Sequence, residues 1–403
     1  MKYAFLVGDG MADYPLSELG GRTPLEAAHT PNMDRIASCR IGCLQTIPEG
    51  MEPGSDVANL SLLGYEPGRY HTGRSPFEAA SMGVELAQGE VAFRMNLVTL
   101  EISGEDRIVM SSHSAGDITS KEGRTLVEGI ADDLAAPGIK IFPGIAYRHL
   151  LTWRNGPSGV KTFPPHDYLE KDVSFYLNGS KDDPVAGLIR RSWAMLKDHP
   201  VNLLRRKRGL MEANSVWLWG QGTAPALPRF TELYNVSGGV ISAVDLIRGI
   251  GVYAGLVPVH VEGATGYLDT NYIGKGTGAV HALKRFDFVF VHLEAPDEAS
   301  HNGHVKDKIT AIESFDRDVV GTVLNGMRGV EDFKIMVATD HFTPVSRRTH
   351  STEPPPFAWA TAAELAGCSG AKGFSESNAV ESGLYFRSGR EMMKKFMTVE
   401  SSP

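Results

Sequence analysis

Runs of apolar residues alternate with amphipathic stretches at both ends of the chain. Short β-branched and aromatic runs at 3–7, 286–291 and 333–338 predict mostly buried strands. Between the last two runs, residues 305–328 have the spacing of a long amphipathic helix. Strands that alternate with helices in this way favour an α/β fold, with a mostly parallel sheet sandwiched by helices.

The middle of the chain has a different pattern. Residues 89–112 look like extended β segments, and a helix is expected at about 184–206. We therefore predict an inserted, smaller α+β domain at 75–208. The metal-binding catalytic domain would then consist of residues 1–74 and 209–403.

Composition excludes several classes of protein. The 403 residues are 42% hydrophobic and 22% charged, as in an ordinary globular protein. The net charge of -8 gives no general basic surface, so nucleic acid is not an expected partner. No apolar run approaches the roughly 20 residues of a membrane helix, so no membrane partner is expected either.

Cysteine content and the N-terminus bear on the compartment. The chain has three cysteines, Cys39, Cys43 and Cys368, and its first strand begins without a leader segment. A reducing cytoplasm fits this pattern best. Cys39 and Cys43 are four residues apart, but no second pair completes a metal site, so we interpret them as two small half-buried residues.

Aspartate and histidine gather at or just beyond the predicted strands, where an α/β sheet places its functional groups. Asp297 and His301 share one face if they lie on a helical turn. Carboxylate oxygen together with imidazole nitrogen suits Mn²⁺ or Zn²⁺ better than Ca²⁺, with Mg²⁺ or Co²⁺ as alternatives. The candidate metal ligands are Asp9, Asp297, His301, Asp340, His341 and His350.

Ser55 is a candidate nucleophile in the tight turn 53–56. A serine hydroxyl is weakly nucleophilic at its free pKa and needs activation. A pair of divalent metal ions would supply it, one polarising a phosphate and one stabilising the attacking or leaving oxygen. This combination indicates phosphoryl or sulfuryl transfer.

Longer motifs give the chain a family resemblance that runs nearly end to end. The chain resembles the archaeal-type cofactor-independent phosphoglycerate mutases, a branch of the alkaline phosphatase superfamily. The motifs that carry this resemblance lie at 8–10, 18–28, 30–34, 54–65, 73–80, 219–222 and 292–298.

The resemblance implies a mechanism and a division of the ligands. Ser55 would take the phosphoryl group from 3-phosphoglycerate and return it to the 2-hydroxyl, with no bisphosphoglycerate. The inserted domain would be a lid that holds the small phosphorylated sugar acid. One metal would be bound by Asp9, Ser55, Asp340 and His341, and the other by Asp297, His301 and His350. The candidate substrate-binding residues are Arg94, Asn96, His113, Arg148, His149, Arg248 and Lys275.

Other functions stay open at this level. Where the family commonly has Ser-Ala-Gly-His, this chain has Asp117 in place of the histidine. Bacterial relatives have been proposed to be homoserine kinases, so transfer to another acceptor such as homoserine is one alternative. Hydrolysis of a phosphate or sulfate ester is a second, and a non-catalytic metal-binding role is a third. A homo-oligomer is compatible with all of them.

Overall fold

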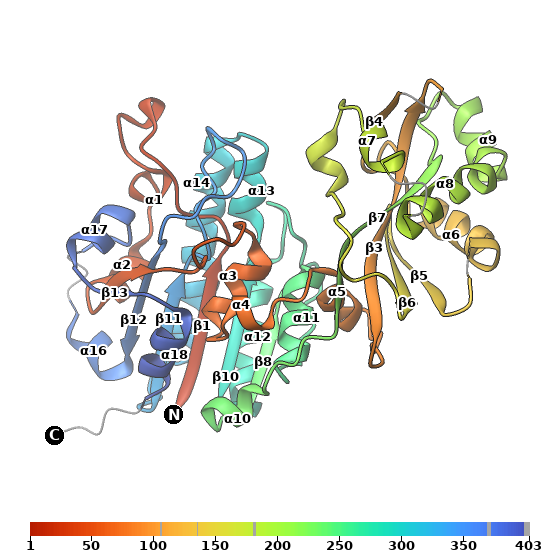
Figure 1. Cartoon of the computed structure of the whole chain (residues 1–403). Helices are drawn as coiled ribbons and strands as arrows, with labels where there is room; N and C mark the ends of the chain where they lie inside the picture. The colour runs from red at the N-terminus through yellow and green to blue at the C-terminus, as the bar shows by residue number, and fades with distance from the viewer. Residues whose placement is uncertain (105–106, 135, 180–182, 369–371, 399–403) are drawn as a thin grey trace. The chain divides into compact units, whose positions relative to one another are not determined.

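The chain forms two compact units. The computed structural model describes residues 1–104, 107–134, 136–179, 183–368 and 372–398. The first unit contains Met1–His71 and Ala226–Pro403, and the second contains Thr72–Pro225 (Figure 1). The boundary predicted at 208 was wrong. The chain returns to the first unit only after β7 (Ser215–Thr223), because that strand pairs with a strand of the second unit.

The first unit is built on a mostly parallel sheet, as predicted. Its central strand β1 is parallel to both of its neighbours, β10 and β11, and β12 is antiparallel to both of its own. In spatial order the strands are β13 (Tyr385–Phe386), β2 (Ile41–Leu44), β12 (Pro356–Thr361), β11 (Phe333–Ala338), β1 (Lys2–Gly8), β10 (Phe288–Leu293), β8 (Gly238–Ile241) and β9 (Val257–Pro258).

Helices cover both faces of this sheet. Alternate residues of β1 point to opposite faces, because side chains alternate along a strand. Ala4 and Leu6 join the core beneath α2, α12 and α14, whereas Tyr3 and Phe5 pack edge-on against Phe396 of α18. The helical segments of this unit are η1 (Ser17–Leu19), α1 (Pro24–Ala27), α2 (Pro31–Ala37), α3 (Ser55–Leu62), α4 (Pro67–Tyr70), α10 (Phe230–Tyr234), α11 (Asp245–Tyr253), α12 (Tyr272–Arg285), α13 (Ala295–His301), α14 (Val305–Ser314), η3 (Phe315–Val320), α15 (Gly321–Gly326), α16 (Ala362–Gly367), α17 (Glu376–Glu381) and α18 (Gly389–Met397).

Two predicted helices differ from the observed ones. The run predicted at 305–328 is helical, but η3 in its middle is a π-helical segment. Asp316 of η3 accepts a hydrogen bond from the Met33 N–H near the start of α2. The helix predicted at 184–206 is two helices that meet at Pro200. A proline lacks the N–H donor and disfavours helical geometry in the residue before it.

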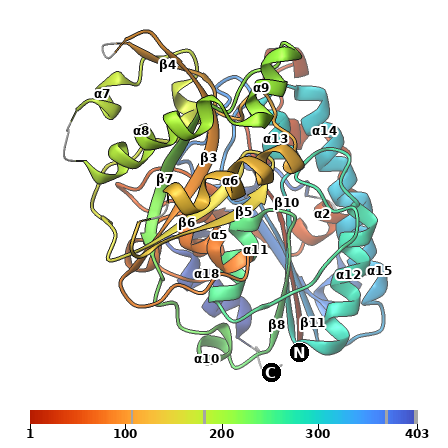
Figure 2. The ribbon, with the colours of Figure 1, turned by 90° about the vertical axis from the view of Figure 1, so that its right-hand side faces the viewer.

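The second unit is an antiparallel sheet packed against helices (Figure 2). Strand β3 pairs with β4, β6 and β7, and β5 pairs with β6. Leu126 of α6 and Ile189 of α8 are buried in its core. Its elements are α5 (Ser75–Ser81), β3 (Glu90–Ile102), β4 (Ile108–Ser112), α6 (Ser120–Leu134), β5 (Ile139–Ile145), β6 (Arg148–Arg154), η2 (Pro165–Tyr168), α7 (Ser174–Leu177), α8 (Pro184–Lys197), α9 (Pro200–Lys207) and β7. Within the described ranges, no helix of either unit has the length and apolar character needed to cross a membrane.

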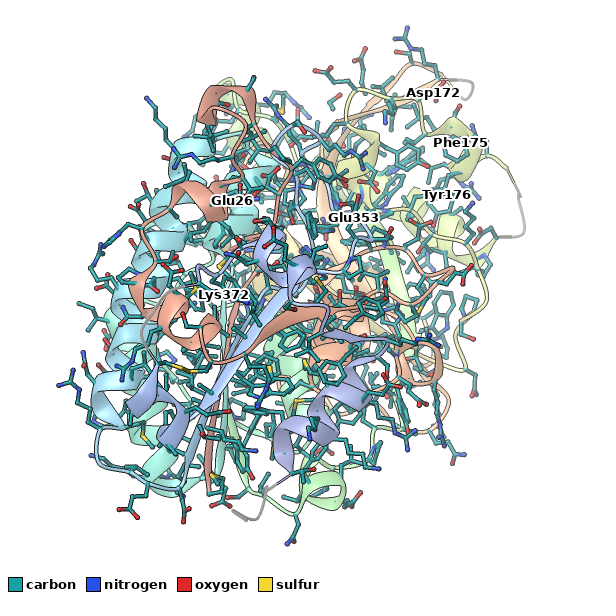
Figure 3. The ribbon with its side chains drawn as sticks, turned by 90° about the vertical axis from the view of Figure 1, so that its left-hand side faces the viewer. Glu26, Asp172, Phe175, Tyr176, Glu353 and Lys372 are labelled. Atoms are coloured by element: carbon teal, nitrogen blue, oxygen red, sulfur yellow. A yellow bond between two sulfur atoms is a disulfide. The ribbon has the colours of Figure 1, made fainter. Side chains whose placement is uncertain are left out.

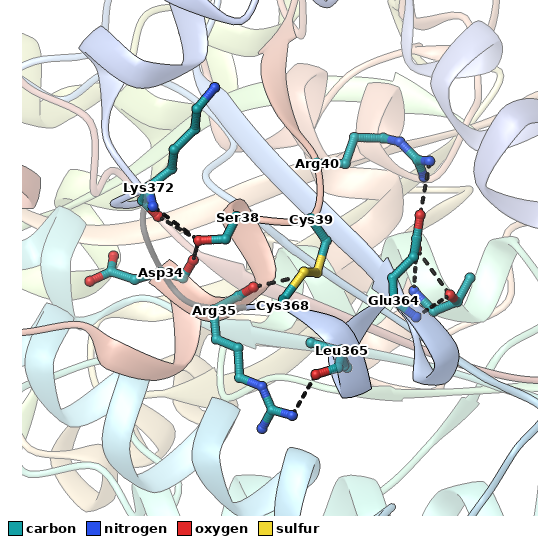
Figure 4. The surroundings of a disulfide bond; sticks show 10 residues. Asp34, Arg35, Ser38, Cys39, Arg40, Glu364, Leu365, Cys368 and Lys372 are labelled. Carbon is teal, nitrogen blue, oxygen red and sulfur yellow. Dashed lines mark hydrogen bonds and ion pairs between the residues drawn. A yellow bond between two sulfur atoms is a disulfide. The ribbon is translucent and has the colours of Figure 1, made fainter.

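A disulfide bond joins Cys39, just after α2, to Cys368, just after α16 (Figure 4). Close by, Arg40 forms a 3.1 Å ion pair with Glu364 of α16. Cys43 is buried in β2, and its thiol forms no disulfide bond within the part of the chain that the structure describes. Cys39 is half-buried as predicted, whereas Cys43 is buried. The disulfide partner of Cys39 was not predicted.

Glu376 is a partly buried acid whose titration should be visible in the stability of the fold. It accepts hydrogen bonds from the Asp13 N–H at 2.9 Å and from the Thr23 hydroxyl at 2.7 Å. Thr23 also caps α1 in a capping box with Glu26, which Figure 3 labels. Burial is the main cause that raises the pKa of Glu376, to about 7, although the Asp13 N–H, the Thr23 hydroxyl and Lys308 oppose it.

We therefore expect stability to fall as Glu376 ionises. Because its pKa in the folded chain exceeds the unfolded value of about 4.3, the folded state binds more protons between these values. The contribution of protonated Glu376 to stability is complete below the unfolded-state pKa and is lost as pH rises through about 7. Denaturant unfolding measures the free energy of unfolding at about pH 5 and about pH 9. Between these values the wild type should lose up to about 3 kcal/mol more of this free energy than Glu376→Gln does. An equal pH dependence in both proteins would contradict the assignment.

Candidate active site

Three neighbouring strands of the first unit end at the same edge of the sheet. In the order β11, β1, β10 they are parallel, so their carboxyl ends lie together. Asp9 follows β1, Asp340 and His341 follow β11, and Asp297 lies in α13, which begins two residues after β10. The turn after β1 requires Gly10, which has φ +60° and whose Cβ would lie 2.6 Å from an Asp297 oxygen. The sheet therefore assembles these side chains from segments far apart in sequence.

The first cluster contains Asp9, Asp340 and His341. All three are buried, and their ligand atoms lie within 4.8 Å of one another. His341 Nε2 lies 3.5 Å from Asp9 Oδ1 and 3.3 Å from Asp340 Oδ2. Ser55 Oγ lies 3.3 Å from the same nitrogen, so the candidate nucleophile lies against this cluster.

The second cluster contains Asp297, His301 and His350. Helix α13 places Asp297 and His301 one turn apart, and their Oδ2 and Nε2 atoms are 3.1 Å apart. His350 follows β11 on a loop, and its Nε2 lies 3.6 Å from Asp297 Oδ1. The rings of His341 and His350 have centroids 4.2 Å apart, so the two clusters are neighbours. This grouping is the division that the family resemblance implied.

The clusters concentrate negative charge away from water. Burial, reinforced by the carboxylates of Asp340 and Glu294, raises the pKa of Asp9 well above its ordinary value. Burial and then Asp297 raise the pKa of Glu294 to about 8. Burial opposes ionisation of Asp297 as well, but His350 and His301 outweigh it and hold its pKa well below the ordinary value. Positive charge placed among these groups would stabilise their ionised forms.

The donor atoms fit divalent cations. Asp9 Oδ1 is buried and has no hydrogen-bond partner among the described residues. His301 Nδ1 donates to the Arg348 carbonyl oxygen at 2.9 Å, so in the neutral ring Nε2 would carry the lone pair. Burial opposes protonation of this ring, but hydrogen bonding to Asp297 and the charge of that carboxylate outweigh it and raise the pKa of His301 to about 9, so a cation would have to displace the Nε2 proton. That Nε2 faces His350 Nε2 at 3.0 Å. Carboxylate oxygens and imidazole lone pairs that converge in this way are ligands typical of Mn²⁺ or Zn²⁺.

Ser55 is the first residue of α3, where helix N–H groups lack partners within the helix. A phosphoryl group on its Oγ would therefore lie near the positive end of the helix dipole. One turn later, Asn59 Nδ2 donates to the Ser55 carbonyl oxygen at 2.9 Å and to Asp340 Oδ2 at 3.0 Å. Asn59 thus ties the nucleophile's helix to the first cluster.

Sequence reasoning missed several residues that support the ligands. His292 Nε2 lies 2.9 Å from Asp9 Oδ2, and burial lowers the pKa of His292 to about 4, so the ring is neutral. The Thr343 hydroxyl contacts both Asp297 and His341. His292 and Asn59 lie inside motifs of the resemblance, which was a usable signal. No sequence signal distinguished Thr343.

The predicted substrate-binding residues of the second unit are partly engaged with one another. Arg94 is buried, forms a 2.6 Å ion pair with Glu78 and lies over the Trp219 ring. Asn96 is also buried, and its Oδ1 lies 3.3 Å from Arg94 Nε. The His113 ring lies against the rings of Tyr147 and His166. The structure therefore gathers polar and aromatic groups on β3 and its neighbours.

Two further members of this set lie on β6. Arg148 is exposed, with its guanidinium 5.3 Å from the centre of the Tyr147 ring. His149 is buried, and burial lowers its pKa to about 4. Its Nδ1 accepts the Gly144 N–H, so the ring forms part of the packing of this unit.

The remaining two candidates lie in the first unit. Arg248 is on α11 and pairs with Asp245 at 3.5 Å on the same helix. Lys275 is fully buried in α12, and its Nζ donates to the His292 carbonyl oxygen at 3.0 Å. Burial lowers the pKa of Lys275 to about 8. The structure therefore places Lys275 in the core beside His292, and its part in substrate binding stays a prediction.

An α/β fold with one buried and one partly buried cluster of carboxylate and imidazole groups, beside a helix-terminal serine, defines the class of metal-dependent phosphoryl-transfer enzymes. The sequence profile of 2,3-bisphosphoglycerate-independent phosphoglycerate mutase matches residues 37–202. A probable 2,3-bisphosphoglycerate-independent phosphoglycerate mutase of Geobacter sulfurreducens is 47% identical over 98% of this chain and 100% of its own length. The 2,3-bisphosphoglycerate-independent phosphoglycerate mutase of Methanosarcina barkeri is 52% identical over 89% of this chain and 90% of its own length. The chain belongs to the 2,3-bisphosphoglycerate-independent phosphoglycerate mutase family.

Solved structures support the same fold. The PH0037 protein of Pyrococcus horikoshii superposes with a TM-score of 0.82 at 30% identity, over 100% of this chain and 99% of that one. A cofactor-independent phosphoglycerate mutase of Thermoplasma acidophilum gives a TM-score of 0.61 at 25% identity, over 98% and 99%. The fold class predicted from the sequence is therefore confirmed.

Proposed function

We propose that this chain interconverts 3-phosphoglycerate and 2-phosphoglycerate without bisphosphoglycerate, through a phosphoserine at Ser55. The observation that carries the proposal is the 3.3 Å approach of Ser55 Oγ to His341 Nε2, in a cluster of metal-ligand type. Membership of the family supports the substrate. Without such a cluster beside it, a serine at this position would be interpreted as a turn residue only.

The chemical steps follow from the position of Ser55. Its Oγ forms a bond to phosphorus as the bond from phosphorus to the 3-oxygen of the substrate breaks. The proton lost by the Ser55 hydroxyl passes to the departing 3-oxygen. The 2-oxygen of the glycerate then forms a bond to phosphorus as the bond from phosphorus to Ser55 Oγ breaks, and the proton lost by the 2-hydroxyl restores the Ser55 hydroxyl. The N-terminus of α3 stabilises the phosphoryl oxygens in both steps.

Two divalent cations are part of the proposal. Asp9, Ser55, Asp340 and His341 would hold one, and Asp297, His301 and His350 the other. When bound, they would lower the pKa of the serine hydroxyl and neutralise phosphoryl charge. We propose Mn²⁺ or Zn²⁺ for the mixed oxygen and nitrogen ligands, with Mg²⁺ or Co²⁺ as alternatives.

We further propose that the second unit, Thr72–Pro225, which contains the predicted lid residues 75–208, acts as a lid that binds the anionic substrate through residues of β3 and β6. Within the second unit, Arg94, Asn96 and His113 are linked by hydrogen bonds. Arg148 has an exposed guanidinium, which suits bidentate recognition of a carboxylate or phosphate. Excluding water in this way would favour return of the phosphoryl group over hydrolysis.

Arg148→Gln should weaken substrate binding more than the chemical step. A hydrogen bond to a charged group contributes about 1.5–3 kcal/mol, so KM should rise roughly 10- to 100-fold with a smaller change in kcat. Steady-state kinetics with 3-phosphoglycerate measures both. The matched control is Arg124→Gln, since Arg124 is on an exposed helix face with only a 3.5 Å pair to Glu128. Equal KM values in the two variants would remove Arg148 from the proposal.

The activity itself is tested with Mn²⁺ and 3-phosphoglycerate in the absence of bisphosphoglycerate, beside homoserine with ATP. Formation of 2-phosphoglycerate is the expected result. Product from homoserine alone would replace the mutase by a phosphotransferase with another acceptor. Release of inorganic phosphate alone would indicate a hydrolase.

Asp117, where the family commonly has histidine, does not disrupt its own turn. Its carboxylate accepts the Ser114 hydroxyl at 2.9 Å, and residues 115–117 all have positive φ. This substitution makes the homoserine arm of the assay informative. The cytoplasmic location stays a prediction, and the Cys39–Cys368 bond weighs against the reducing compartment on which it rests.

A further inference from the structure

The hydroxyl of Thr343 lies between the two candidate metal clusters. Thr343 is fully buried. Its Oγ1 donates to Asp297 Oδ1 at 2.6 Å, and His341 Nδ1 lies 3.0 Å from the same oxygen. Asp297 belongs to one cluster and His341 to the other, so a single hydroxyl contacts a ligand of each.

The proton inventory of this bridge fixes the tautomer of His341. A threonine hydroxyl has one proton and two lone pairs, whereas an ionised carboxylate can only accept. The hydroxyl proton therefore points to Asp297, and the imidazole must donate from Nδ1. His341 then carries its proton on Nδ1 and leaves Nε2 bare. Nε2 is the nitrogen that faces Ser55 Oγ at 3.3 Å and Asp9 Oδ1 at 3.5 Å.

The main chain of Thr343 is held on both sides. Its N–H donates to the Ala12 carbonyl oxygen at 3.1 Å, and its carbonyl oxygen accepts from Lys308 Nζ at 3.0 Å. Lys308 is itself buried and forms a 2.8 Å ion pair with Asp13. The hydroxyl therefore has little freedom to move, and both ligands meet it at a fixed position.

We propose that Thr343 is a positioning residue that orients Asp297 and His341 together and so couples binding at the two cation sites. The inference rests on the proposed two-cation function. Groups that contact metal ligands from behind commonly change metal affinity about 10- to 100-fold when they are removed. Valine would keep the shape of threonine but would leave Asp297 Oδ1 without its donor and His341 Nδ1 without its acceptor.

The first test measures Mn²⁺ binding by isothermal titration calorimetry for the wild type, Thr343→Val and Thr343→Ser. We expect roughly 10- to 100-fold weaker binding at both sites in the valine variant and near wild-type binding in the serine variant. The matched control is Thr310→Val, since Thr310 is exposed on α14 and bonds only locally, to the Lys306 carbonyl oxygen. Wild-type affinity at either site of Thr343→Val would overturn the coupling.

A second measurement observes the tautomer of His341 in the wild type, and a variant serves only to assign the signal. Nitrogen-15 NMR of the metal-free wild type, with His341 assigned through His341→Gln, should show the proton on Nδ1. A proton on Nε2 would overturn the inference even if the protein binds two cations. A wild type that binds no Mn²⁺ would instead remove the two-cation proposal, and this inference with it.

Discussion

Replacing Ser55 with alanine is expected to lower mutase turnover by on the order of 10⁴-fold or more, because no other group can carry the phosphoryl group between the two oxygens. Mn²⁺ should still bind, since the carboxylate and imidazole ligands of both clusters remain. The first cluster would bind more weakly for want of one oxygen. Turnover is followed by conversion of 3-phosphoglycerate, and metal content by elemental analysis.

Two comparisons make the Ser55 result specific. Ser17→Ala changes an exposed serine in the same unit and should leave turnover unchanged. Acid-stable labelling from phosphorylated substrate should mark the wild-type chain and Ser17→Ala but not Ser55→Ala. Turnover by Ser55→Ala near the wild-type rate would exclude a phosphoserine route.

The second large effect concerns Asp297. Its two oxygens face His301 and His350, and it is the one carboxylate of the second cluster. Asp297→Asn should halve the bound Mn²⁺ and lower turnover by on the order of 10³-fold, because one of the two charges that stabilise the transferring phosphoryl group is lost. Elemental analysis and steady-state kinetics measure the two quantities.

Thermal unfolding provides a readout of Asp297 that needs no activity. A ligand at about 100 times its Kd stabilises the folded state by about 2.7 kcal/mol, so Mn²⁺ should raise the Tm of the wild type more than that of Asp297→Asn. Asp307→Asn, which removes a half-exposed carboxylate of α14 that pairs with His304, is the matched control and should respond like the wild type. Identical Mn²⁺ responses in all three proteins would show that Asp297 holds no cation.

Features set by local geometry could be predicted from the sequence. The 333–338 run is β11 at the same bounds, and the four-residue spacing of Asp297 and His301 is one turn of α13. Adjacent parallel strands with polar residues at their carboxyl ends were enough to bring Asp9 and Asp340 together. In each case the structure is determined by the spacing of apolar residues or by the end of a strand, and both can be recognised within a few residues of the sequence.

Features set by distant partners could not be predicted. The run at 215–219 is recognisable as a strand, but nothing local shows that β7 pairs with β3 and so moves the unit boundary. Cys39 and Cys368 are 329 residues apart, so their spacing carries no pairing signal. Lys275 looks like an exposed helix residue until α12 is packed on the sheet, where its ammonium donates to a main-chain oxygen.

The position of β1 has a consequence for biosynthesis. This strand is made before both of its neighbours in the sheet, β10 and β11, which emerge more than 280 positions later. At about 5–20 residues per second, a ribosome needs roughly 15–60 s to cover that interval. The second unit is a continuous segment and can fold while β1 still waits for its partners. Newly made chains therefore expose an apolar unpaired strand until β10 and β11 have been made, and chaperone binding would matter most during that interval.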